Sequence, residues 1–151
     1  MKRFLLILVA IFIGIQFVRP VKNLSDQAPG PDHLAVLYPP PPGVKAIFER
    51  ACYDCHTNNT RYPWYAHVQP AAWWLNDHIE EGKKHFNFEE FGSYSTKRQL
   101  HKLEELIEEV EEDKMPLPSY RRIHSEARLT PDEVNSLITW TASVRKQIKQ
   151  P

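Results

Sequence analysis

The sequence predicts an all-α protein, a small helical domain behind an N-terminal apolar helix and a proline-rich linker. Glycine is scarce (5 of 151 residues) and proline is abundant (13), which favours helices joined by stiff connections over a turn-rich β protein. Apolar residues recur at three- and four-residue spacing through the second half of the chain, as they do on one face of a helix. The length allows one domain with a short leader.

Residues 1–22 have the order of charges and apolar residues that is typical of a secretory signal. Lys2 and Arg3 precede fifteen mostly apolar residues, 4–18. Fifteen helical residues extend about 22 Å, less than the ~30 Å hydrocarbon core of a bilayer. Because no small-residue cleavage site follows, we favour an uncleaved signal anchor over a removed signal peptide. A buried helix of a cytosolic domain is the third interpretation.

Residues 23–43 form the predicted linker. They contain Pro31 and four consecutive prolines, followed by Gly43, without a helical period. This composition predicts an extended polyproline-type spacer that holds the folded part away from the membrane, with His33 in solvent. A ligand for an SH3-type domain is the alternative.

Residues 44–151 form the predicted folded domain, with helices expected at 44–51, 70–81, 96–113 and from Pro131 onward. Pro70 suits the first turn of the second helix, and Gly82 is expected to end it. The final helix is the most strongly marked, because Thr130 and Glu133 flank a proline in the pattern of a capping box.

Charge and cysteine content exclude two classes of protein. Lys plus Arg and Asp plus Glu number 19 each, so the chain lacks the basic excess expected of a nucleic-acid-binding protein. Two cysteines are too few for the disulfide framework of a small secreted scaffold.

Both cysteines lie in one motif, Cys52-Tyr53-Asp54-Cys55-His56, which has the C-x-x-C-H spacing of a c-type haem attachment site. Two thiols three residues apart can each bond to one vinyl group of the same haem, and the next residue then lies beneath the iron. The motif therefore predicts one haem c, attached through Cys52 and Cys55, with His56 as the proximal iron ligand.

Three other interpretations of the motif remain open. A thioredoxin-type dithiol would need a βαβ pattern, which the sequence lacks. A zinc site would need two further ligands, and no second cysteine pair or close histidine pair is present. A plain disulfide with an incidental histidine is the third.

Met115 is the predicted distal iron ligand. It is the one methionine besides Met1 and lies in the proline-stiffened segment Lys114-Met115-Pro116-Leu117-Pro118. His124 is the alternative, ahead of His67, His78, His85 and His101. Methionine would raise the reduction potential and a second histidine would lower it.

Two supporting contacts are also predicted. Arg61 is a candidate partner for a haem propionate. A backbone carbonyl of Pro63 or Pro70 could accept the Nδ1–H of His56, since metal-bound imidazoles are usually oriented in this way.

The combined motifs resemble the haem-binding domain family of bacterial exported proteins, over about residues 44–144. The residues that carry the resemblance are Cys52 to His56, Asn58, Tyr62-Pro63-Trp64-Tyr65, Pro70, Gly82, Asn87-Phe88, Met115-Pro116, Tyr120, His124 and 129–140. The resemblance implies a cytochrome c-like domain, with Cys52 and Cys55 as covalent haem sites and His56 as an axial ligand. Phe91 and Lys83 depart from the family pattern, where tryptophan and arginine are expected.

These observations together predict a membrane-tethered monohaem c-type cytochrome-like protein that carries single electrons. We expect it on the periplasmic side of the bacterial inner membrane, anchored or released after cleavage, with redox proteins as partners and without nucleic acid. The seven acids of residues 104–113 are either a solvated face or a docking patch for a basic redox partner. A haem enzyme or a gas or redox sensor with an open sixth iron position is the alternative, and a non-haem module is the third.

Overall fold

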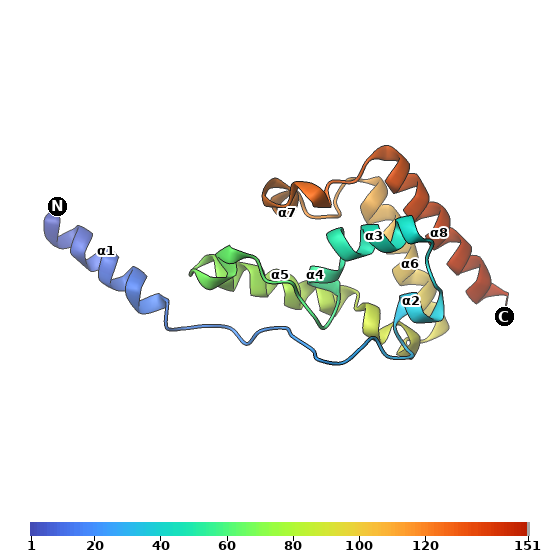
Figure 1. Ribbon diagram of the computed structural model, residues 1–151, viewed down its shortest axis with the longest axis horizontal. Coiled ribbons are helices and arrows are strands. Elements are labelled where there is room, and N and C mark those ends of the chain that lie inside the picture. The colour runs from blue at the N-terminus through green and yellow to red at the C-terminus, as the bar shows by residue number, and fades with distance from the viewer. Residues whose placement is uncertain (151) are drawn as a thin grey trace.

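The computed structural model describes residues 1–150, and these form helices and connecting segments without a β-strand (Figure 1). The predicted all-α class is therefore confirmed for the described chain. The α-helices are α1 (Lys2–Ile15), α2 (Leu34–Leu37), α3 (Pro42–Ala51), α4 (Tyr53–His56), α5 (Ala71–His85), α6 (Thr96–Glu111), α7 (Pro118–Ile123) and α8 (Pro131–Lys149). Three 3₁₀ helices connect them: η1 (Trp64–His67), η2 (Phe88–Ser93) and η3 (Ser125–Ala127).

Local sequence signals explain where the long helices begin. The Thr130 hydroxyl accepts a hydrogen bond from the Glu133 amide, and the Glu133 carboxylate accepts one from the Thr130 amide, so the predicted capping box is present. Ser95 caps α6 in the same way, by accepting from the Arg98 amide. The helix expected to stop at Gly82 instead continues to His85, so the prediction of a helix end at Gly82 is wrong.

The main core lies where α3 and α6 pack against α8. Its centre is aromatic: Phe48 of α3 contacts Phe88 and Trp140 edge to face, with ring centroids 5.0 and 5.2 Å apart. Phe91, one of the two departures from the family pattern, is fully buried in this core. A smaller cluster lies between η1 and α5, formed around Tyr65, Leu75 and Ile79.

Part of the predicted linker belongs to the folded domain. Leu34 of α2 is fully buried in the main core. His33, expected in solvent, is buried, and its Nδ1 accepts a hydrogen bond from the Ala35 amide and so caps α2. Asp32 pairs with η2 through a hydrogen bond from the Gly92 amide to its carbonyl (2.8 Å). The expectation of a free spacer is therefore wrong at these positions, because single apolar residues between prolines give no periodic signal.

Asn23 fixes the start of the same segment. Its side-chain amide donates to the Thr57 carbonyl (2.8 Å) and to the Thr60 hydroxyl (2.9 Å). Lys83, the second departure from the family pattern, donates to the Asn23 side-chain oxygen (2.7 Å). The chain is thus fastened beside the cysteine motif before it reaches α2.

Replacing Leu34 with alanine tests whether residues 23–43 are part of the fold. We expect the free energy of unfolding to fall by about 3 kcal/mol, as for other fully buried leucines. Urea denaturation followed by circular dichroism measures the change. The matched control Val36→Ala, on the exposed side of the same helix, should stay within about 0.5 kcal/mol of the parent. Equal small effects of the two variants would contradict the packing.

The leader forms α1, a 14-residue helix whose apolar side chains are exposed and which projects from one end of the molecule (Figure 1). Within residues 1–150, no helix combines the length and the apolar character needed to cross a membrane. The residues that follow α1 are held by the domain. Gln16 exchanges two hydrogen bonds with the backbone of Gln69 (2.9 and 3.2 Å).

Candidate functional site

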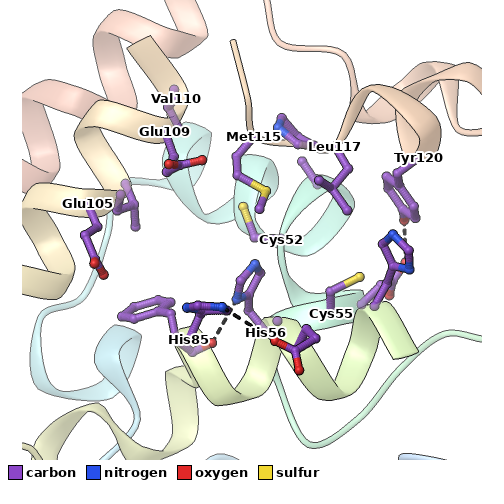
Figure 2. Close-up of a pocket in the computed structure, with 18 of the residues that line it drawn as sticks. Cys52, Cys55, His56, His85, Glu105, Glu109, Val110, Met115, Leu117 and Tyr120 are labelled. Atoms are coloured by element: carbon purple, nitrogen blue, oxygen red, sulfur yellow. Dashed lines mark hydrogen bonds and ion pairs between the residues drawn. The ribbon is translucent and has the colours of Figure 1, made fainter. Parts of the chain in front are cut away.

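The principal cavity lies between α4, α5, α6 and the segment that leads into α7, and has a volume of about 530 Å³. Ligand sites commonly occupy 300–1,000 Å³, so a cofactor-sized group fits. The predicted residues Cys52, Cys55, His56 and Met115 all line it. The side chains of His56 and Met115 point into the same space, and both cysteines face it (Figure 2).

The cysteine motif reaches the cavity because α3 ends immediately before it. Cys52 closes α3 by donating its amide to the Phe48 carbonyl (3.0 Å), and its own carbonyl accepts the amide of His56 (3.1 Å). Residues 53–56 form a single helical turn, α4. This turn brings two thiols and one imidazole to one wall of the cavity.

The imidazole of His56 is oriented by a backbone carbonyl. Its Nδ1 lies 2.8 Å from the carbonyl oxygen of Phe86, so the prediction of Pro63 or Pro70 as the acceptor is wrong. Burial lowers the pKa of His56, which keeps the ring neutral. With the proton on Nδ1, the Nε2 lone pair is free to bind a metal. Phe86 could not be found from the sequence, since every residue offers the same backbone acceptor.

Both thiols are partly buried. Burial is the main reason why the pKa values of Cys52 and Cys55 each rise to about 12. Catalytic dithiols have lowered thiol pKa values, so this environment does not favour a thioredoxin-type function. Both cysteines are free in the structure.

Gly82 allows α5 to approach the cysteine motif closely. A methyl group at this position would lie 2.6 Å from the carbonyl oxygen and 3.2 Å from the Cβ atom of Cys55. The backbone oxygen cannot move without shifting α4. The sequence predicts a helix end at Gly82, whereas in the structure this glycine lies within α5 and admits the backbone of Cys55.

Replacing Gly82 with alanine should therefore displace the motif from α5. We expect purified Gly82→Ala protein to hold less haem per chain and to lose at least about 2 kcal/mol of unfolding free energy, in the range of overpacked sites. Haem absorbance per chain and urea denaturation measure both. Gly43→Ala is the control, because nothing lies within 4 Å of a Cβ atom there. A Gly82→Ala protein with normal haem content and stability would contradict this role.

Met115 reaches the cavity through a turn at the end of α6. Asp113 has a positive φ of 56°, a left-handed conformation that reverses the chain after a helix. The amides of Lys114 and Met115 then both donate to the Glu109 carbonyl (2.9 Å each). These bonds hold the thioether side chain over the cavity, where it also packs against the main core.

Asp54, between the two cysteines, connects the motif to the Met115 side of the cavity. It accepts a hydrogen bond from the Tyr120 hydroxyl of α7 (2.7 Å) and pairs with the guanidinium of Arg61 (3.0 Å). Arg61 is largely exposed and is not among the residues that line the cavity. Its predicted contact with a propionate stays a prediction, and the structure gives this side chain a carboxylate partner instead. The hydrogen bond between Tyr120 and Asp54 could not be predicted from the sequence, since neither residue spacing nor composition indicates it.

The imidazole of His124 lies beside the cavity, with its polar atoms in other contacts. Its Nε2 lies 2.9 Å from the Tyr65 hydroxyl and its Nδ1 lies 3.2 Å from the Glu126 carboxylate. Its ring stacks on Tyr120 at 4.2 Å. His78 and His85 line the cavity from α5, whereas His124 is not among the lining residues. Of the two distal candidates, Met115 is the one that the structure places at the cavity.

Removing the Tyr120 hydroxyl tests the connection through Asp54. Tyr120→Phe should lower the free energy of unfolding by about 2 kcal/mol, the value of a hydrogen bond to a charged group, because the ring still stacks on His124. Thermal or urea unfolding of the purified protein measures the loss. Tyr62→Phe is the control, because Tyr62 does not line the cavity. Its hydroxyl accepts a hydrogen bond from the backbone amide of Asn23. The variant should loosen Asn23 without changing the absorbance of bound haem. A Tyr120→Phe protein with the parent's free energy of unfolding would contradict the connection.

Comparison with known proteins identifies the chain's family. No match was found among curated proteins or among solved structures. The haem-binding domain family matches residues 10–143, most of the chain. The match begins well before residue 44, in agreement with the packing of residues 23–37 against the domain. The chain therefore belongs to the haem-binding domain family, and the resemblance found in the sequence is confirmed.

Proposed function

We propose that the protein is a monohaem c-type cytochrome-like electron carrier, exported and tethered to the membrane by its N-terminal helix. The observation that carries this proposal is the convergence of four donor side chains, Cys52, Cys55, His56 and Met115, on one cavity of about 530 Å³. Two thiols, an imidazole and a thioether are the donor set that a covalently held haem with two axial ligands requires.

The cysteines would provide the covalent attachment. Each thiol would add its S–H across one vinyl C=C bond of the haem, which forms one C–S and one C–H bond and needs no oxidant. His56 Nε2 would bind the iron from one side, with its ring held by the Phe86 carbonyl. When bound, the haem supplies a one-electron iron couple. The chain sets its potential through the axial ligands, burial and nearby hydrogen bonds.

Met115 would complete the iron coordination and keep the site closed to exogenous ligands. Its backbone is fixed by two hydrogen bonds to Glu109, and its segment is linked to the motif through Tyr120 and Asp54. A fixed ligand on each side favours electron transfer, since little must move when the charge changes. An open or labile sixth position would instead support the alternative of a haem enzyme or sensor.

The leader supports the proposed location. The apolar side chains of α1 are exposed, and the helix begins with the basic residues Lys2 and Arg3. An apolar helix with a basic start is typical of a signal anchor, and export would place the domain on the periplasmic side of the bacterial inner membrane. Redox proteins would be its partners there. Glu105 and Glu109 of the acidic α6 line the cavity, so a basic partner could approach at this side.

Two measurements on the protein made in a host with c-type maturation test the proposal. Intact mass spectrometry after denaturation should give the mass of the chain plus one haem, and voltammetry should give one reversible one-electron wave. A denatured mass without haem would overturn covalent attachment. A covalent haem without a reversible wave would overturn the electron carrier and favour the enzyme or sensor.

A further inference from the structure

The end of the domain next to α1 carries exposed aromatic residues. Trp64 is 77% exposed, Trp74 39% and Trp73 37%. They come from two elements, η1 and the first turn of α5, which lie at the end of the domain nearest α1 (Figure 1). Val68, between them in sequence, is also exposed. We refer to Trp64, Val68, Trp73 and Trp74 as the aromatic patch.

The patch is continuous with the leader. Val18, which follows α1, accepts hydrogen bonds from the indole Nε1 of Trp73 and from the side-chain amide of Gln69 (2.9 Å each). Gln16 forms two further hydrogen bonds with the Gln69 backbone. The apolar surface of α1 therefore leads through the exposed Phe17 and Val18 directly to the patch.

Charge at this junction suits an anionic surface. Arg19 and Lys22 follow residues 16–18 and are both exposed, and Lys22 lies 5.4 Å from the ring of Tyr62. Tryptophan is enriched at membrane–water interfaces, where its ring meets acyl chains and its N–H finds a polar partner. Basic residues near the surface are attracted to anionic headgroups.

We propose that the aromatic patch docks on the lipid bilayer into which α1 inserts, so that the domain is held against the membrane in one orientation. This inference rests on the proposed membrane tether and deepens it. The predicted spacer would let the domain move freely, whereas hydrogen bonds between residues 16–18 and residues 69–73 fix it at the point where the chain leaves α1.

Docking of the patch would also fix the distance between the membrane surface and the cavity. Gly82, which contacts the cysteine motif, lies eight residues beyond Trp74 on α5, and at 1.5 Å per residue this is about 12 Å along the helix. The cavity would then lie close to the lipid surface at a constant distance, and partners would reach it from the sides that the membrane leaves open.

Fluorine NMR of the full chain in lipid nanodiscs tests the proposal. The four tryptophans are labelled as 5-fluorotryptophan, and each line is assigned by a Trp→Phe variant. The discs contain phosphatidylcholine and phosphatidylglycerol, with or without a nitroxide on the lipid near the headgroup. We expect the nitroxide to remove the lines of Trp64, Trp73 and Trp74, while the line of the buried Trp140 keeps its intensity.

Paired variants give the control. Trp64→Asp with Trp74→Asp should return the line of Trp73 in nitroxide discs, because charged side chains do not enter the interface. Val36→Asp, at an exposed apolar position on α2, should leave the loss unchanged.

Other results would overturn the proposal in distinguishable ways. If the chain enters the discs but a water-soluble relaxation agent, and not the lipid nitroxide, broadens the patch, the tether stands and docking fails. If neither agent reaches the patch, a second copy or another protein covers it. If the chain stays outside the discs, tether and docking both fail. Haem absorbance of the same sample reports separately on the proposed cofactor.

Discussion

Replacing Met115 with alanine is expected to lower the reduction potential and to open the iron to carbon monoxide. Alanine cannot bind iron, so the position opposite His56 is left to water or to an added ligand. Methionine ligation raises haem potentials. Because axial ligands and their surroundings set such potentials over roughly 0.8 V, we expect a fall on the order of 0.1 V. Voltammetry and reduced spectra with and without carbon monoxide measure both effects.

Leu117→Ala is the matched control for Met115→Ala. Leu117 also lines the cavity and lies in the same proline-stiffened segment, but it has no donor atom. This variant should keep the parent's carbon monoxide response. His124→Ala should keep it as well, since that ring contacts Tyr65 and Glu126. If potential and carbon monoxide binding are unchanged in Met115→Ala and change in His124→Ala, the distal ligand is the histidine.

Replacing Cys52 and Cys55 together with serine is expected to abolish haem retention on a denaturing gel. A hydroxyl does not form the thioether, so that any haem left in the cavity would be held only by His56, Met115 and apolar contacts, which denaturation breaks. The gel is stained for haem peroxidase activity and compared with total protein. Expression in the same maturation host keeps the supply of haem constant.

Each single substitution, Cys52→Ser or Cys55→Ser, serves as the control for the double variant. One thioether remains in each, so both should keep haem on the gel at a reduced level. Haem that stays on the double variant after denaturation would contradict attachment through this motif.

The helices of the folded domain could be predicted well because their signals are local. The capping box at Thr130 and Glu133 and the apolar stripe of α6 act within a few residues, and the structure contains both helices. The packing of Leu34 could not be predicted in this way. Its burial depends on η2, which packs against α2 but is distant in sequence, and a short helix between prolines shows no periodicity.

The residues of the site could likewise be predicted where their signals are local and not where they depend on long-range contacts. The spacing of Cys52, Cys55 and His56 is a local constraint, and the lone Met115 was marked by its prolines; all four line one cavity. The acceptor for His56, the Tyr120–Asp54 hydrogen bond and the close approach at Gly82 are long-range contacts. Backbone carbonyls have no residue signature, and a glycine that admits a neighbouring backbone has the same appearance in a sequence as one that ends a helix.

Visible spectra of the exported protein, oxidised and reduced, with and without carbon monoxide, test the central claim most directly. A covalent haem held between His56 and Met115 should give sharp reduced bands that carbon monoxide does not move. A prompt shift with carbon monoxide would contradict a closed site and favour the enzyme or sensor. A protein without haem bands would contradict the use of the four converging side chains as a haem site.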